Sequence, residues 1–311
     1  MGAFINPFTD WGFKHIFGRE ASKDVLINFL NSLLEGERVI TDVHYMNNER
    51  EPEQMEMRKI VYDIYCKTDT GEYIIVEMQN RWQEYFSDRA LFYMSESIVK
   101  QAQKGNKWNF NLTAVYGIFF VNFTIDKNDA EHFCKDIALI DKRTGKVFSN
   151  KFRQIYIEIP RFRKEKTDCD NFFEYWIYNL VNMKELNEIS FKDKDAIFGR
   201  LEQIASQANL SKEERAQYEY EWKVYNDYFN TLESGEKKAR AEGLEKGMAE
   251  GMAIGMEKGI EKGMEKGIEK GIEKGAEQKN LDNARKMKEK GISFDMIADI
   301  TGLSVEAIRL L

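Results

Sequence analysis

The sequence predicts a mixed α/β core followed by a long helical region. Apolar, β-branched and aromatic runs of strand length recur in the first half of the chain, and helical spacing of apolar residues separates them. The second half carries helical patterns only, and 3 of the 311 residues are proline. These observations indicate one α/β domain over residues 1–165, with helices after it.

The elements of this domain can be placed one by one. Gly36 is a plausible C-cap of the first helix, and Pro160 ends the last strand. The link Asp69-Thr70-Gly71 suits a three-residue hairpin loop with Gly71 in the left-handed conformation. In order, we expect a helix at 20–36, a strand at 37–46, a hairpin at 62–80, a helix at 84–105 and strands at 112–123 and 153–160.

Three segments follow the α/β domain. Residues 166–235 have Met and aromatic stripes at helical spacing, which predict a helical subdomain whose stripes form its core. Residues 236–279 contain a tetrapeptide repeat with nine glycines at every fourth position, mostly followed by an apolar residue, Glu and Lys. Residues 280–311 predict a small module in which the turn TGLS joins two short helices.

The repeat and the terminal module each allow two interpretations. Each glycine costs a helix about 1 kcal/mol relative to alanine, so the repeat is either a flexible charged tether or a helix that forms against a partner. The second interpretation makes the protein a homo-oligomer through this segment. The terminal module resembles a helix-turn-helix, but its second helix carries only Arg309 as positive charge. It therefore serves either DNA reading or, as we favour, a helical cap or oligomer contact.

Composition and charge exclude several classes of protein. No stretch approaches about 18 apolar residues, so we expect no membrane span. The N-terminus lacks the pattern of a secretory signal, and the 3 cysteines are scattered, which favours a reduced, cytoplasmic compartment. The net charge of -7 argues against coating nucleic acid through bulk charge, although a local basic patch or a metal ion could still reach phosphates.

Two carboxylates interrupt the most apolar strand pattern of the chain. If Thr68 lies across the hairpin from Glu72, then Asp63 lies nearly opposite Glu77, and Gln79 shares the face of Glu77. Val61, Asp63 and Tyr65 should likewise share a face. A buried pair of this kind needs a shared proton, a basic partner or a divalent cation such as Mg²⁺ or Mn²⁺, unless this face is simply solvated.

The hairpin and its flanks resemble a known family. Asp63 followed by Glu77-x-Gln79, the stretch PFTDWGFKHIFG and the helix pattern DRALFYMSESIVKQAQKG are similar to those of PD-(D/E)xK nuclease family transposases, also called the Rpn family of recombination-promoting nucleases. The glycine-punctuated repeat and the small helical end also recur in that family. The resemblance implies a restriction-endonuclease-like core with the order α-β-β-β-α-β.

The resemblance also implies a chemistry. It implies hydrolysis of DNA phosphodiesters by a Mg²⁺-dependent endonuclease, with Asp63 and Glu77 as metal ligands and Gln79 as the third active-site residue. The superfamily has lysine where this chain has Gln79, which can orient a water molecule but brings no positive charge. The role that the resemblance implies is recombination, mobile-element activity or phage defence.

Several residues could support this site. Arg58, Lys59 or Arg89 could replace the missing lysine. Arg89, with Tyr93 one turn later, could contact phosphate or orient a carboxylate, or form an ordinary salt bridge. The matching N-terminal stretch adds Asp10, which is either a third acidic ligand or, as we favour, a helix cap, and also Lys14.

Other residues are weaker candidates for chemistry. Glu20 is a weaker third acid than Asp10. His15, His44 and His132 have no neighbour at metal-ligand spacing, which favours packing or surface roles for all three. The alternative to an enzyme is a DNA-binding or assembly protein that keeps the nuclease fold without catalysis.

Overall fold

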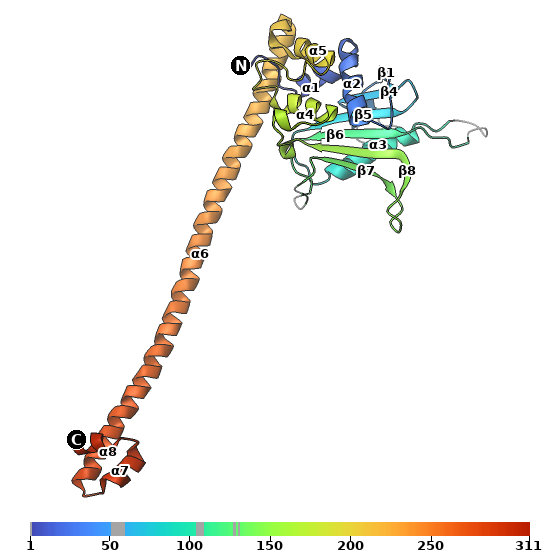
Figure 1. Cartoon of the computed structure of the whole chain (residues 1–311). Coiled ribbons are helices and arrows are strands. Elements are labelled where there is room, and N and C mark those ends of the chain that lie inside the picture. Colours follow the sequence, from blue (N-terminus) through green and yellow to red (C-terminus); the bar gives the residue numbers. More distant parts are fainter. Residues whose placement is uncertain (1, 51–59, 104–108, 127–128, 130) are drawn as a thin grey trace. The chain divides into compact units, whose positions relative to one another are not determined.

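The computed structural model describes residues 2–50, 60–103, 109–126, 129 and 131–311. The chain divides into two compact units, Met1–Tyr228 and Phe229–Leu311, and each is described by itself. Figure 1 shows the sheet of the first unit, with helices on both of its faces. The strands are β1 Val43–Tyr45, β2 Glu49–Arg50, β3 Ile60–Val61, β4 Ile64–Thr68, β5 Tyr73–Gln79, β6 Val115–Val121, β7 Cys134–Ile140 and β8 Val147–Glu158. The helices are α1 Asp10–Phe17, α2 Lys23–Leu33, α3 Phe86–Val99, α4 Phe172–Asn182, α5 Ala196–Ala205, α6 Lys212–Glu289, α7 Phe294–Thr301 and α8 Val305–Leu310.

The sheet of the first unit is mixed and has the strand order β1-β4-β5-β6-β8-β7. The neighbours β5, β6 and β8 run parallel to one another. Strand β4 pairs antiparallel with both β1 and β5, and β7 pairs antiparallel with β8. All seven residues of β6 are buried, because β6 lies inside the sheet and both of its faces are covered. The architecture is the mixed α/β fold that the sequence predicts.

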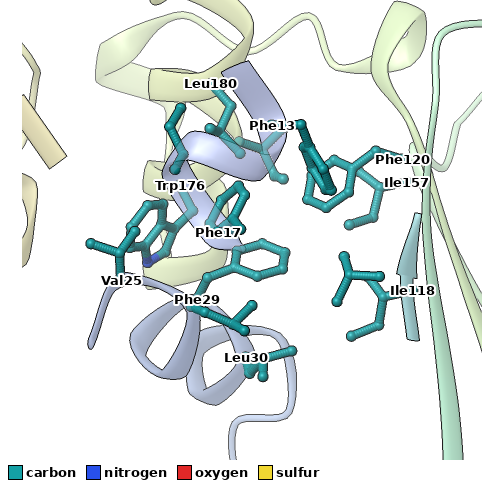
Figure 2. Packing of buried hydrophobic residues seen from close by; sticks show 14 of the residues in the cluster. Phe13, Phe17, Val25, Phe29, Leu30, Ile118, Phe120, Ile157, Trp176 and Leu180 are labelled. Atoms are coloured by element: carbon teal, nitrogen blue, oxygen red, sulfur yellow. The ribbon is translucent and has the colours of Figure 1, made fainter. Parts of the chain in front are cut away.

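Helices cover the two faces of the sheet with two separate cores. The larger core joins α1, α2, α4 and α5 to one face, and aromatic rings fill it; Phe17, Phe29, Phe120 and Trp176 are nearly fully buried. Figure 2 shows these rings packed together with aliphatic side chains of the sheet and of α2. The smaller core lies on the other face and includes Phe86 and Met94 of α3. The first helices after residue 165 thus share a core with the N-terminal helices.

The hairpin has the predicted register. Ile64 pairs with Val76 and Lys67 with Tyr73, which is the alignment that sets Thr68 opposite Glu72 and Asp63 opposite Glu77. Gly71 has φ +98°, as the three-residue loop requires.

The face assignment before β4 was wrong. Tyr62 and Tyr65 lie in the same core and their rings stack at 4.9 Å, although residues three apart on a regular strand point to opposite faces. The strand alternation therefore breaks between β3 and β4, next to Asp63.

Strand β7 was missed by the sequence reading. It is the edge of the sheet beyond β8, and none of its residues is fully buried. An exposed edge strand lacks the apolar pattern that identifies the interior strands. The register between β7 and β8 also shifts near Leu139, which interrupts any regular alternation.

The second unit contains most of α6 and the terminal helices. The glycine repeat is helical and belongs to α6. The turn TGLS joins two short helices, as predicted: Gly302, with φ +72°, ends α7, and the Ser304 side chain caps α8. Ala284, Ile297 and Ile308 form a small buried core that joins the end of α6 to both helices. Within the described part of the chain, no helix is long and apolar enough to cross a membrane.

Candidate active site

The two hairpin carboxylates lie together where β4 begins and β5 nears its end. The Asp63 backbone N–H donates to Glu77 Oε1 at 3.2 Å, and the Met78 backbone N–H donates to Asp63 Oδ2 at 2.8 Å. Asn48 Nδ2 donates to the Asp63 carbonyl at 2.8 Å and so holds the chain where the strand alternation breaks. Each carboxylate thus accepts a hydrogen bond from a backbone N–H of the other strand. The register of the hairpin brings these groups together.

Burial and like charge set the protonation of this pair. Glu77 is 7% exposed, and burial, followed by the neighbouring Asp63 carboxylate, raises its pKa to about 8. Burial also raises the pKa of Asp63, although the Met78 N–H and Lys14 act in the opposite direction. At neutral pH, ionisation of both carboxyls is therefore disfavoured, and positive charge close to the pair would favour it.

Lys14 brings part of that charge. Its Nζ lies 3.6 Å from Asp63 Oδ1 and 2.7 Å from Asp10 Oδ1. The Lys14 side chain is 38% exposed, so the ammonium group reaches both the carboxylate and solvent. Phe13 and Phe17 anchor α1 in the larger core (Figure 2), and this packing fixes the helix that carries Lys14.

Asp10 does not cap α1, contrary to the alternative that the sequence favoured. The cap is Thr9, whose side chain accepts from the Gly12 N–H, while Asp10 is the first residue of the helix. Its carboxylate, one turn before Lys14, instead holds the Lys14 ammonium group.

Gln79 is held by Arg89 and by main chain. Arg89 Nη2 donates to Gln79 Oε1 at 2.5 Å, and Gln79 Nε2 donates to the Arg81 carbonyl at 2.9 Å. Arg89 Nη1 donates to Gln83 Oε1 at 2.8 Å. The guanidinium group thus clamps the end of β5 to the loop after it, and its charge lowers the pKa of Glu77 without forming an ion pair.

Tyr93 supports the arginine by packing. The Arg89 guanidinium carbon lies 5.8 Å from the centre of the Tyr93 ring and 5.5 Å from that of Phe86. The Tyr93 carbonyl accepts from the Tyr62 hydroxyl at 3.0 Å, which joins α3 to the segment before Asp63.

The remaining candidates lie elsewhere or cannot be placed. Arg58 and Lys59 fall outside the described residues. Glu20 is 70% exposed and pairs with Lys23. His15 is buried, while His44 and His132 lie at the surface beside aspartates. The packing and surface roles expected for the three histidines agree with these positions.

The sequence reading missed Gln83 and undervalued Lys14. Gln83 is the second acceptor of Arg89, and its only sequence signal is its position four residues after Gln79. Lys14 lies 49 positions before Asp63, and no local pattern connects the two residues.

A divalent cation fits the donor set. Asp63 and Glu77 each commit one oxygen to a backbone N–H. Glu77 Oε2 and Asp63 Oδ1, which also faces the Lys14 ammonium group at 3.6 Å, are the oxygens that could bind a ligand. Carboxylate oxygens suit Mg²⁺ or Mn²⁺, and Mg²⁺ commonly binds through one or two carboxylates and keeps several waters. Among the described residues, no group of three or more His, Cys, Asp or Glu forms a ready-made metal cluster, so the proposed site rests on Asp63 and Glu77.

The mixed sheet flanked by helices, with two acids facing each other on an interior hairpin, defines a restriction-endonuclease-like nuclease fold. Residues 7–235 match the model of the PD-(D/E)XK nuclease family transposases, and the chain belongs to that family. Its membership supports a nuclease-type function. No curated protein and no solved structure matched the chain.

Proposed function

We propose that this protein is a Mg²⁺-dependent endonuclease that hydrolyses phosphodiester bonds of DNA. The observation that carries the proposal is the carboxylate pair, in which the Asp63 N–H contacts Glu77 Oε1 at 3.2 Å beside the Lys14 ammonium group. A purely structural role would favour an ion pair between one of these acids and an arginine. In the described chain, neither acid forms such a pair. Family membership adds independent support.

Each residue has a distinct task in this proposal. Asp63 and Glu77 would hold the cation, which when bound supplies a water of lowered pKa and offsets charge on the phosphate. Mn²⁺ would substitute, since it takes the same oxygen ligands. Lys14 contributes the positive charge that Gln79 lacks, and it lies close enough to Asp63 to face a phosphate oxygen at the same site. Arg89 positions Gln79 and adds a second cation nearby.

The test is plasmid cleavage by the purified full chain with Mg²⁺, Mn²⁺, Ca²⁺ or EDTA. We expect nicking or linearisation with Mg²⁺ or Mn²⁺, and at least a hundredfold loss in Asp63→Asn and Glu77→Gln, which preserve shape and remove the charge. Exposed Glu20→Gln is the matched control, since it removes a carboxylate that lies away from the pair. Metal-independent cleavage, or cleavage that survives both substitutions, would show that the acids are not catalytic.

We further propose that copies of the chain assemble through the repeat of α6. Met248, Met252 and Met256 recur every four residues, and each is at least 66% exposed on the helix. Burial of this row of methionines against a second copy of the chain would stabilise a dimer. The adjoining Glu-Lys pairs could form ion pairs with the Glu-Lys pairs of that second copy. Light scattering of the full chain at increasing concentration tests this assembly.

We propose cytoplasmic action in recombination, mobile-element activity or defence against phage. A DNA substrate and three unpaired cysteines, Cys66, Cys134 and Cys169, support the compartment. The biological roles rest on family resemblance. Recombination frequency and phage plating efficiency, compared between the wild-type protein and Asp63→Asn, test them.

A further inference from the structure

A cavity of about 310 Å³ lies on the first unit, and neither Asp63 nor Glu77 lines it. Its walls come from the loop after β5, the start of α3, the loop after β6, and strands β7 and β8. Ligand pockets commonly span about 300–1,000 Å³, so this cavity suits a ligand of one or two rings. The catalytic proposal uses none of the side chains that line it, apart from a contact between Gln83 and Arg89.

Aromatic side chains form much of the wall. Phe86 meets Phe123 edge to face at 5.6 Å and Tyr156 at 6.1 Å. Phe86 and Tyr156 are buried, so this part of the wall is rigid. Trp82 also lines the cavity but is 64% exposed. Within the described chain it lies in no ring pair, so its face is open to a flat ligand.

The polar groups of the cavity are mostly neutral. The Tyr156 hydroxyl donates to Gln154 Oε1 at 2.6 Å, which fixes the Gln154 amide. Gln154 is only 9% exposed, and in the described chain its Nε2 donates no hydrogen bond. Two charged side chains also line the cavity: exposed Glu84, and Lys135, whose charge Asp129 and Glu158 balance. A flat heterocycle with hydrogen-bonding edges matches these groups better than a phosphate does.

The sheet fixes how far the cavity lies from the acids. Glu77 pairs with Phe119, and Phe119 pairs with Tyr156, so the three residues lie side by side on adjacent parallel strands. Strands are about 4.8 Å apart, which places the Cα atoms of Glu77 and Tyr156 about 10 Å apart. Arg89 bridges the two regions, since it bonds Gln79 on one side and Gln83 on the other.

We propose that this cavity receives one unstacked nucleobase of the DNA strand being cut, stacked on Trp82 and read by Gln154. The inference rests on the proposed function for its choice of ligand. A strand whose phosphate lies at Asp63 and Glu77 would carry its neighbouring base to the cavity, because the separation is that of one or two nucleotides. The enzyme would therefore favour single-stranded or locally unpaired DNA, in which a base leaves the stack at little cost.

The test measures binding rather than cleavage. Fluorescence anisotropy with the full chain in Ca²⁺, with which no cleavage is expected, would compare a labelled 12-nucleotide single strand with the same strand carrying abasic sugar-phosphate units at its centre. The variants are Trp82→Ala and Gln154→Leu. Tyr85→Ala is the matched control, because Tyr85 is an equally exposed aromatic of the same loop, at 67% against 64%, that does not line the cavity.

We expect the wild type to bind the abasic strand about tenfold more weakly than the normal strand. Both cavity variants should lose this preference, and Tyr85→Ala should keep it. Equal binding of the two strands by the wild type, equal effects of Trp82→Ala and Tyr85→Ala, or no binding of either strand would overturn the proposal. This experiment and the cleavage test can fail independently of each other. Base-dependent binding can persist without cleavage, and cleavage can persist without base-dependent binding.

Discussion

At the scale of single residues, the site combines two buried acids with a lysine from a distant helix. The high pKa of Glu77 follows from burial and from Asp63, whereas Lys14 stays partly exposed. The PD-(D/E)xK pattern of the wider superfamily has a lysine where this chain has Gln79. Among the described residues, Lys14 of α1 brings an ammonium group to Asp63, so a positive charge that the hairpin motif lacks comes from a distant helix.

Replacing Lys14 should therefore slow cleavage without unfolding the protein. We expect Lys14→Met to lower the maximal rate on the order of a hundredfold, because a cation facing developing charge is lost. Lys14→Arg should retain a larger share of the rate. Steady-state cleavage measured at saturating Mg²⁺ checks this expectation, and circular dichroism controls for the fold. Equal rates for Lys14→Met and the wild type would remove Lys14 from the site.

The buried side chain of His15 should make the unfolding free energy depend on pH. It stacks on Trp11 at 4.4 Å, its Nε2 contacts the Ile204 carbonyl, and burial followed by the charge of Arg19 lowers its pKa. The native state thus favours neutral His15, whereas the unfolded chain binds the proton more readily. This contribution to stability is present above the unfolded pKa of about 6.5 and is lost as the pH falls toward the lower folded pKa.

Comparison of the wild type with His15→Gln between pH 7.5 and pH 5 isolates this effect. Glutamine can keep a hydrogen bond to Ile204 but does not titrate in this range. We expect the wild type to lose more unfolding free energy than the variant as the pH falls, measured by urea denaturation. Parallel losses in both proteins would assign the acid sensitivity to other groups.

At the scale of elements, the β4–β5 hairpin sets the site. The register places Asp63 opposite Glu77, and the three-residue loop that ends in Gly71 sets this register. A slip by one residue would move each acid to the other face of its strand. The loop is therefore a structural requirement of the site, although it lies at the other end of the hairpin.

Gly71→Ala should destabilise the protein by about 1–2 kcal/mol, the usual cost of the left-handed region for a residue with a Cβ. The added Cβ itself would find only ordinary contacts, 3.7 Å from Thr113 and 3.8 Å from Lys67, so backbone strain is the cause. Gly199→Ala in α5 is the matched control. Its Cβ would meet nothing within 4 Å, and alanine is the better helix former. Thermal unfolding should thus shift down for the first variant and stay level or rise for the second.

At the scale of the whole molecule, the two compact units differ in what holds them. The first unit has two apolar cores around a sheet, whereas the second has a three-residue buried core at the end of a long exposed helix. The start of α6 belongs to the first unit, where Tyr218 is buried and its hydroxyl accepts from the Asn6 N–H at 2.9 Å. The site and its cavity lie entirely within this unit.

A chain that ends after residue 235 should therefore keep the fold of the first unit. We expect near-UV circular dichroism and the midpoint of its thermal transition to match those of the full chain, because both cores remain. Light scattering should report a lower assembly state, since the repeat is removed. Loss of the near-UV signal would mean that residues beyond 235 are needed for folding.

The sequence by itself determined the fold class and the pairing of the acids. Interior strands carry dense apolar runs, and a hairpin loop with glycine at a fixed place sets the register of the two strands that it joins. Both signals come from residues that are close together in the sequence, so they can be recognised without the tertiary structure. The exposed edge strand β7 gave no such signal, because it has no face that must be fully buried.

Only the tertiary structure decided the surroundings of the acids. The contact of Lys14 with Asp63, the clamp of Arg89 on Gln79 and Gln83, and the cavity wall formed by Phe86 and Tyr156 join residues from different elements. Such contacts depend on how helices pack on the two faces of the sheet, and no sequence period records that packing. The sequence thus predicts which acids face each other. The charge and the shape of their surroundings arise from packing between distant elements.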